Sequence, residues 1–193
     1  MKVYYIGSPR GIKEYGAIYK KTTKILKELG YDLISDLIVD LDGAEKLYAA
    51  SSYKKRVEYY KLTMEAIKKC DIAVVEVSIH SMSMGYIVEK VLSLGKPVIV
   101  LHLVGHEPYF FSGIENEKLQ ICEYNESNIK QVLKQALNLA RENMDVRFNF
   151  FISPKIGAYL DWVSQNKKLP RAVYLRRLIE GDMTKSDYVK KKT

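Results

Sequence analysis

The chain has 193 residues, a length that suits one ordinary domain with a small addition. Hydrophobic residues make up 47% and charged residues 28% of the sequence, which is typical of a globular protein and excludes a disordered or fibrous chain. The net charge of +8 is uneven, because residues 145–193 carry 11 basic against 5 acidic side chains. The rest of the chain is nearly neutral, so the C-terminal part favours a polyanionic partner.

Neither a membrane span nor a disulfide is expected. No apolar run reaches the roughly 18 residues that a span requires, and no signal peptide precedes the first apolar run. Cys70 and Cys122 lie far apart in apolar runs and are interpreted as buried thiols. These features predict a cytoplasmic protein without a membrane partner.

Residues 1–143 alternate short apolar runs with helical patterns. Strands are expected at 3–6, 32–39, 71–77, 98–101 and 119–122, and helices at 14–29, 54–69, 85–94 and 126–143. Strands separated by helices indicate an α/β fold, a flavodoxin-like doubly wound parallel sheet covered on both faces. In such sheets the ligand lies at the carboxyl ends of the strands.

The loop after the first strand has the residues of an anion site. Neither G-x-G-x-x-G nor G-x-x-x-x-G-K-[ST] occurs there, which argues against ordinary dinucleotide and nucleoside triphosphate sites, and we expect no cofactor. In Gly7-Ser8-Pro9-Arg10-Gly11, glycines permit close backbone approach, Ser8 offers a hydroxyl and Arg10 offers a bidentate fork. A second loop, Ser81 to Gly85, opens a helix whose N-terminus can receive a phosphate.

No metal site is expected. His102 and His106 are four residues apart, but no third ligand lies near them in the sequence.

These loops resemble the nucleoside 2-deoxyribosyltransferase superfamily, including its 2'-deoxynucleoside 5'-phosphate N-hydrolase branch, over about residues 1–140. The resemblance rests on Tyr4-x-x-Gly7-Ser8-x-Arg10-Gly11, on Cys70-Asp71-x-x-Val74-x-Glu76-Val77 followed by Ser81, on Gly85-Tyr86, and on Gly95-Lys96-Pro97-Val98. It implies that Ser8, Arg10, Gly11 and Ser81 hold a 5'-phosphate and that Tyr4 lines the sugar or base pocket. Gly7 and Gly85 complete the expected nucleotide site.

The sequence departs from this family at its catalytic positions. The family has a nucleophilic glutamate after Gly-Tyr, where this chain has Ile87. A further carboxylate of the family, eight residues ahead of the motif aspartate, corresponds to Thr63. A glycosidic displacement needs a carboxylate near the sugar carbon, so no catalytic residue is assigned. Three alternatives remain open: a binding site without chemistry, a pocket that binds nothing, and catalysis by a substitute such as Glu65 or Glu76.

Residues 144–184 form a separate pattern, followed by a basic flexible tail at 185–193. In Val146 to Ile152 the side chains alternate, with Arg147, Asn149 and Phe151 on one face. Ser153-Pro154 begins a helix, and a second helix starts around 169–172 and ends at Gly181-Asp182.

This region resembles the ribbon-helix-helix family of the Arc and MetJ repressors over about residues 145–182. The resemblance implies that strands from two chains pair and enter a DNA major groove. The residues that would read base edges are Arg147, Asn149 and Phe151, and Pro170 and Arg171 would hold a phosphate. The turn between the helices usually contains glycine, and here Asn166 or Lys168 must adopt it.

The leading hypothesis is therefore a DNA-binding transcriptional regulator, a homodimer or higher even oligomer that binds double-stranded DNA and whose first domain senses a nucleotide. The alternative is a nucleoside 2-deoxyribosyltransferase or deoxynucleoside 5'-monophosphate N-glycosidase in which the C-terminal region serves oligomerisation. A dimerisation arm without DNA binding, and an inert body that scaffolds the arm, are the remaining readings.

Overall fold

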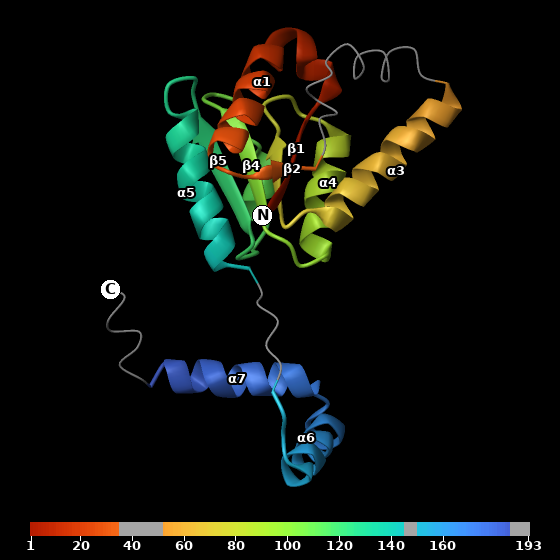
Figure 1. Ribbon diagram of the computed structural model, residues 1–193, viewed down its shortest axis with the longest axis vertical. Coiled ribbons are helices and arrows are strands. Elements are labelled where there is room, and N and C mark those ends of the chain that lie inside the picture. The colour runs from red at the N-terminus through yellow and green to blue at the C-terminus, as the bar shows by residue number, and fades with distance from the viewer. Residues whose placement is uncertain (35–51, 145–149, 186–193) are drawn as a thin grey trace. The chain divides into compact units, whose positions relative to one another are not determined.

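The structure, a computed structural model, describes residues 1–34, 52–144 and 150–185 (Figure 1). The chain divides into two compact units, Met1–Asp145 and Val146–Thr193, which are considered separately.

The first unit is built on a five-stranded parallel sheet. Its strands are β1 (Lys2–Gly7), β2 (Asp32–Leu33), β3 (Ile72–Glu76), β4 (Val98–Leu103) and β5 (Leu119–Tyr124). They lie in the order β2-β1-β3-β4-β5, with Gly7 opposite Glu76. This is the flavodoxin-like order, so the expected doubly wound α/β fold is confirmed. The order reverses between β1 and β3, whose carboxyl ends therefore flank the topological switch point.

The strand sequences explain why the sheet is central. Every residue of β3 is buried, as expected for a run of apolar and β-branched side chains covered on both faces. β2 ends at Leu33, and residues 35–39 of the expected strand 32–39 lie outside the described part of the chain.

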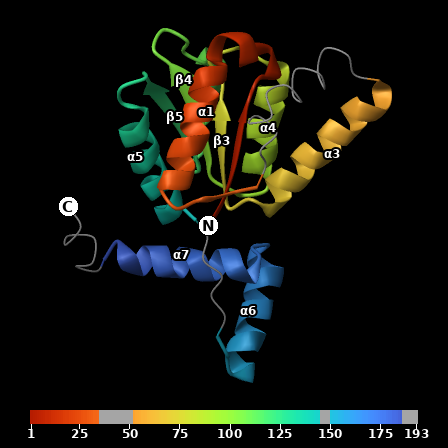
Figure 2. The same ribbon diagram turned by 45° about the horizontal axis from the view of Figure 1, so that its top comes forward.

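Helices cover both faces of the sheet. α1 (Ile12–Glu28) and α5 (Ile129–Glu142) lie on one face, while α3 (Tyr53–Lys69) and α4 (Met82–Ser93) lie on the other (Figures 1 and 2). The buried positions of α1 recur at helical spacing, among them Ile18, Ile25 and Leu26. Together with the strands they form one hydrophobic core.

A lysine secures the C-terminal end of α3. The Nζ atom of Lys96 donates hydrogen bonds to the carbonyl oxygens of Ile67 at 2.9 Å, Lys68 at 2.6 Å and Cys70 at 2.7 Å. The last carbonyls of a helix have no partner within the helix, and a cation there also complements the helix dipole. The turn before β4 thereby holds the segment in which the chain passes from α3 to β3.

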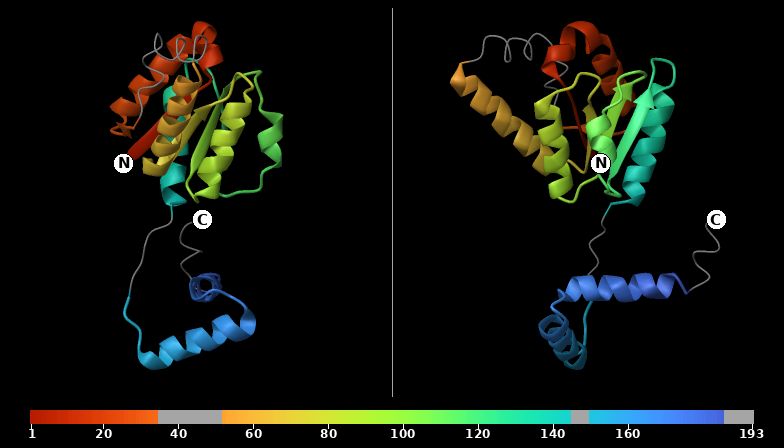
Figure 3. Two further views of the ribbon diagram at one scale, coloured as in Figure 1. Left: turned by 90° about the vertical axis from the view of Figure 1, so that its right-hand side faces the viewer. Right: turned by 180° about the vertical axis from the view of Figure 1, so that it is seen from behind.

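The opposite half of α3 is much less covered. Residues 53–62 are exposed or half-buried, and this half of the helix extends away from the sheet in Figures 1 and 2 and in the right-hand view of Figure 3. Burial begins at Thr63, whose side chain is 3% exposed.

The second unit contains the two expected helices, α6 (Pro154–Lys167) and α7 (Arg171–Met183). The hydroxyl of Ser153 accepts a hydrogen bond from the backbone N–H of Ile156 at 3.4 Å, as expected for a cap followed by proline. Lys168 adopts the left-handed conformation with φ of 50°. Of Asn166 and Lys168, the two residues expected to make the turn between the helices, it is therefore Lys168 that does so.

The expected ribbon strand, residues 146–152, lies mostly outside the described part of the chain. Residues 145–149, which include Arg147 and Asn149, lie outside the described ranges, and residues 150–152 have no regular secondary structure. A ribbon would need a second chain to pair with, so the ribbon-helix-helix assignment remains a proposal.

Neither cysteine is in a disulfide. Cys70 is buried, as expected, whereas Cys122 is only half-buried because it lies on β5 at the edge of the sheet. Burial raises the pKa of the Cys70 thiol to about 11, although Lys96 opposes the shift. In the part of the chain that the structure describes, no helix is long and apolar enough to cross a membrane.

Candidate active site

The loop after β1 places polar groups at the switch point. β1 ends at Gly7, a short 3-10 turn η1 (Pro9–Gly11) follows, and α1 begins at Ile12. The backbone N–H of Gly11 donates to the carbonyl oxygen of Ser8 at 2.9 Å, which closes the turn. Ser8 is 1% exposed, and its hydroxyl has no hydrogen-bond partner.

The two glycines of this loop have a packing role that the sequence did not reveal. A Cβ atom on Gly7 would lie 2.9 Å from Cζ of Tyr19, and one on Gly11 would lie 2.5 Å from the Tyr19 hydroxyl oxygen. Tyr19 also donates a hydrogen bond to the carbonyl of Ser8 at 3.4 Å. Close contact with this tyrosine accounts for both glycines, and their expected role in ligand binding stays a prediction.

The N-terminus of α4 faces the same edge from β3. Ser81 occupies the N-cap position with φ of −145°, yet its side chain does not cap the helix. The first backbone N–H groups of a helix have no partner within it and carry partial positive charge. A helix of twelve residues that begins here is therefore suited to an anion.

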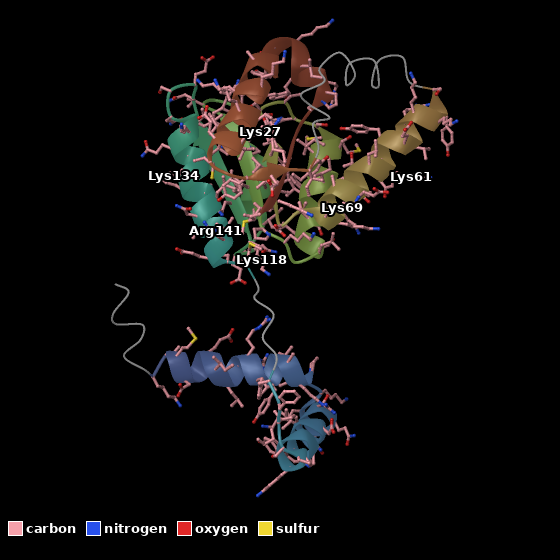
Figure 4. The ribbon with its side chains drawn as sticks, in the orientation of Figure 1. Lys27, Lys61, Lys69, Lys118, Lys134 and Arg141 are labelled. Atoms are coloured by element: carbon pink, nitrogen blue, oxygen red, sulfur yellow. The ribbon has the colours of Figure 1, made fainter. Side chains whose placement is uncertain are left out.

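Arg10 joins the two loops. Its Nη2 atom donates to the carbonyl oxygen of His80 at 3.3 Å, which places the guanidinium next to the start of α4. The structure thus brings Arg10 beside Ser81, while Gly7, Ser8 and Gly11 belong to the same β1 loop. Figure 4 labels further basic side chains of this unit, which are spread over α1, α3, α5 and the turn before β5.

Tyr4 of β1 and Thr63 of α3 are both buried and are neighbours. Among the residues described, the hydroxyls of Tyr4, Tyr5, Ser8 and Thr63 are the buried side-chain polar atoms without a hydrogen-bond partner. Burial raises the pKa of Tyr4, and Thr63 is its neighbour. An unpaired buried hydroxyl costs free energy, which is why such atoms often mark a site that a ligand or water completes.

The catalytic positions of the family carry no carboxylate here. Ile87 is 4% exposed and packs into the core from α4, together with Val88 and Val91. Thr63 likewise offers only a hydroxyl.

Both candidate substitute carboxylates already have partners within the chain. Glu65 is exposed and pairs with Lys69 at 3.4 Å. Glu76 is 1% exposed and accepts hydrogen bonds from the backbone N–H of Ser78 at 2.9 Å, the Ser78 hydroxyl at 2.5 Å and the Tyr124 hydroxyl at 2.5 Å.

Glu76 instead belongs to a hydrogen-bond network between the carboxyl ends of neighbouring strands. The Ser78 hydroxyl accepts from the backbone N–H of Leu103 at 2.8 Å, so the network joins β3, β4 and β5. Burial raises the pKa of Glu76, while its hydrogen bonds from Ser78 and Tyr124 oppose the rise. The sequence did not predict this network, because Ser78 and Tyr124 are far apart along the chain.

A pocket of about 620 Å³ opens between α4 and the 3-10 helix η2 (Tyr109–Gly113). Its lining is mainly apolar and aromatic: Val77, His80, Ser81, Met82, Met84, Gly85, Tyr86, Pro108, Tyr109, Phe110 and Phe111. A smaller cavity of about 290 Å³ adjoins it at His80 and Tyr109 and is lined also by Ser78, His106 and Glu107. The three consecutive aromatic residues Tyr109, Phe110 and Phe111 are the feature of the sequence that could have indicated the larger pocket.

The histidines have ordinary partners. Nδ1 of His102 lies 3.1 Å from the carbonyl oxygen of Leu103, and Nδ1 of His106 lies 3.0 Å from that of Ser78. Within the described ranges no group of three or more metal-ligating side chains occurs.

The residues expected to bind DNA are only partly described. Phe151 is fully exposed, and Pro170 occupies the N-cap position of α7. Arg171 forms an ion pair with Asp161 of α6, so this guanidinium already has an intramolecular partner.

The chain is similar to several proteins that are named as enzymes. It is 31% identical over 103 residues to a protein of Thermofilum pendens, and the match covers 53% of this chain and 68% of that protein. It is 27% identical over 105 residues to a protein of Methanococcoides burtonii, and this match covers 53% of this chain and 81% of that protein. Both carry the provisional name 2'-deoxynucleoside 5'-phosphate N-hydrolase 1. A mouse 5-hydroxymethyl-dUMP N-hydrolase is 23% identical over 135 residues, covering 68% of this chain and 76% of that protein.

Among solved structures, a CMP N-glycosidase of Clostridium botulinum matches with a TM-score of 0.47 and 18% identity, covering 72% of this chain and 99% of that one. No profile of a known protein family matches the chain.

These names contradict the hypothesis of a DNA-binding transcriptional regulator. The relatives are named as enzymes that act on nucleotides, which favours the enzyme alternative. The excess of basic residues in the C-terminal region is compatible with a polyanionic partner but does not identify DNA as that partner. With 31% identity across 68% of a relative's length, the chain belongs to the family of the 2'-deoxynucleoside 5'-phosphate N-hydrolases.

Proposed function

We propose that the first unit binds a 2'-deoxynucleoside 5'-monophosphate at the carboxyl edge of the sheet and hydrolyses its N-glycosidic bond. The observation that carries this proposal is the meeting of Arg10 with the uncapped N-terminus of α4, beside the unpaired hydroxyl of Ser8. Family membership supplies the reaction class.

The phosphate accounts for the polar part of the site. Backbone N–H groups at the start of α4 and the guanidinium of Arg10 are donors of the kind that hold a phosphate dianion. The Ser8 hydroxyl supplies a donor that has no other partner. A nucleoside without the phosphate would leave all of these groups unused.

The residues at the catalytic positions restrict the chemistry. In the hydrolysis, a water oxygen bonds to the anomeric carbon, the carbon–nitrogen bond breaks, and a proton from the water ends on the departing base. Ile87 cannot form a covalent glycosyl intermediate, so the sugar cannot be held for transfer to a second base. We therefore expect slow hydrolysis without base exchange.

The test is base release, measured by chromatography, from deoxynucleoside 5'-monophosphates and from the matching deoxynucleosides. We expect release from the monophosphates only, and its loss in Arg10→Ala. Binding without release would overturn the catalytic half of the proposal, and failure to bind any monophosphate would overturn both halves.

A gain-of-function variant sharpens this test. In Ile87→Glu combined with Thr63→Asp, carboxylates occupy both family positions, and we expect base release to rise by about 10²- to 10⁴-fold. The control is Ile87→Gln with Thr63→Asn, which has nearly the same shape without the charges. Equal rates in the two double variants would show that residues 63 and 87 do not face the reacting bond.

We further propose that the second unit pairs with a second copy of the chain in the ribbon-helix-helix manner and so serves oligomerisation. α6 buries Leu160 and Val163, whereas Trp162 is 52% and Ile179 is 60% exposed. Two helices of this size rarely form a stable core alone, and pairing would cover these side chains.

Sedimentation measures this directly. We expect the full-length chain to sediment at an even multiple of its monomer mass and Ile179→Asp to sediment as a smaller species. Leu139→Asp, at a 47% exposed leucine on α5, is the matched control. A monomeric wild type would exclude the pairing.

A further inference from the structure

A glutamate is buried directly beside the loop that follows β1. Glu76, the last residue of β3, is 1% exposed and pairs in register with Gly7, the residue at which β1 ends. Neighbouring strands lie roughly 4.8 Å apart, so the backbone of Glu76 is one strand spacing from the start of the β1 loop. Glutamates are rarely buried to this extent, and the proposed reaction gives this one no role.

The hydrogen-bond donors of Glu76 are all uncharged in the described part of the chain. Its Oε1 atom accepts from the backbone N–H and the hydroxyl of Ser78, and its Oε2 atom accepts from the Tyr124 hydroxyl. An ionised carboxylate accepts at both oxygens, so these donors suit the charged form. None of them carries a positive charge that would neutralise it.

Tyr19 of α1 lies between this carboxylate and the β1 loop. It is an electrostatic neighbour of Glu76, and it donates a hydrogen bond to the carbonyl oxygen of Ser8 at 3.4 Å. Its ring is 1% exposed and packs against Gly7 and Gly11. Charges in such a buried setting are screened much less than charges in water. The other titratable groups that face Glu76 are Tyr5 of β1, Tyr15 of α1 and His102 of β4.

A phosphate in the β1 loop would add charge of the same sign as that of Glu76. A phosphate monoester carries about −1.5 to −2 charges at neutral pH. A nearby like charge disfavours the ionised form of a carboxylic acid, and burial, which already raises the pKa of Glu76, acts in the same direction. Protonation of Glu76 would remove the repulsion.

We propose that phosphate binding at the β1 loop is linked to protonation of Glu76, whose carboxylate is ionised in the free protein and takes up a proton from the solvent when the phosphate binds. The proposal rests on the proposed function, because it needs a phosphate at this loop. The proton bonds to a carboxylate oxygen, and no other bond changes. Affinity is then highest below the pKa of Glu76 in the free protein and falls as pH rises toward its pKa in the complex.

Calorimetry in buffers that differ in ionisation enthalpy counts the protons taken up on binding. The full chain would be titrated with deoxyadenosine 5'-monophosphate between about pH 5 and 8, as the wild type and as Glu76→Gln. A rise of one unit in the pKa of Glu76 on binding corresponds to about a tenfold change in affinity and a peak uptake of roughly half a proton per ligand. We expect the wild type to exceed Glu76→Gln by this amount in both quantities.

The difference between the two proteins isolates Glu76. The phosphate and the histidines titrate in the same pH range, and both proteins share them. Glutamine keeps an acceptor for Ser78 and offers its amide to the oxygen of Tyr124, so the network can be retained. Glu123→Gln, at an exposed glutamate of β5, is the matched control and should take up as many protons as the wild type.

Tyr124→Phe provides a second test that leaves the carboxyl group in place. The Tyr124 hydroxyl lowers the pKa of Glu76 by donating to its charged form, so the peak of proton uptake should move to higher pH in this variant. Tyr53→Phe, at a 77% exposed tyrosine of α3, should leave the peak where it is.

The outcomes separate the two proposals. If the wild type does not bind the nucleotide at any pH in this range, the proposed function fails. If it binds with the same proton uptake as Glu76→Gln, or if Tyr124→Phe leaves the peak unmoved, the linkage is overturned and the phosphate site stands. A Glu76→Gln variant whose affinity is lower by the same factor at every pH would show a structural role alone and would also overturn the linkage.

Discussion

The two units of this chain use apolar residues in opposite ways. In the first unit, every residue of β3 is buried and one core extends through the sheet and its four helices. In the second, α7 has no buried residue at all within its described length. The contrast shows that the first unit has a hydrophobic core, whereas the exposed apolar side chains of α7 are those that the proposed pairing would cover.

The largest effect should come from a matched pair of leucines. Leu137→Ala, at a fully buried position of α5, should lower the free energy of unfolding by about 2–5 kcal/mol because a cavity forms. Leu178→Ala, at a 52% exposed position of α7, should change it by less than about 0.5 kcal/mol in dilute solution. Chemical denaturation measures both. A Leu178 effect that grows with protein concentration would support pairing, and a large one independent of concentration would refute the contrast.

Removal of the lysine that caps α3 should have a smaller effect. Lys96→Met keeps the aliphatic stem but leaves the three carbonyl oxygens without their charged donor, so we expect a loss of about 1.5–3 kcal/mol. Lys68→Met, at an exposed lysine of the same helix, is the control in the same thermal unfolding experiment. Equal stability of the two variants would show that the cap contributes nothing.

The cap of α6 should matter only locally. Ser153→Ala removes the acceptor for the Ile156 N–H and should destabilise the helix by about 1 kcal/mol. Hydrogen exchange is expected to speed up at the first turn of α6 and to remain unchanged in the sheet. Faster exchange in the sheet as well would contradict the independence of the two units.

Glu76 should give the first unit a pH dependence. Burial raises its pKa above the usual 4.5, so its contribution to stability is present at lower pH and is lost as pH rises through the folded-state pKa. The stability of the wild type should therefore fall relative to Glu76→Gln as pH rises from 4 toward neutrality. Melting curves of both proteins across that range test the sign, and a difference that is constant with pH would show that Glu76 does not titrate.

The fold was largely predictable, because buried strands and helical periodicity are local patterns. The apolar run at β3 and the turn with glycine and lysine before β4 predicted the ends of these two strands to within one or two residues. Ser153-Pro154 likewise marked the start of α6.

The site was less predictable, because it depends on contacts between distant segments. Nothing near Gly7 or Gly11 in the sequence indicates that Tyr19 packs against them. The partners of Glu76 lie on other strands, and the wall opposite α4 comes from η2, which follows a different strand. The departures from the family at Ile87 and Thr63 could be recognised in the sequence, because a substitution at a motif position is visible without the tertiary structure.

Titration of the full-length chain with a deoxynucleoside 5'-monophosphate and with the matching deoxynucleoside tests the central claim most directly. If Arg10 and the start of α4 hold a phosphate, the monophosphate binds, the nucleoside binds far more weakly, and Arg10→Ala removes most of the difference. Equal affinity for the two ligands, or an Arg10→Ala variant that still prefers the monophosphate as the wild type does, would contradict a phosphate site at this edge of the sheet.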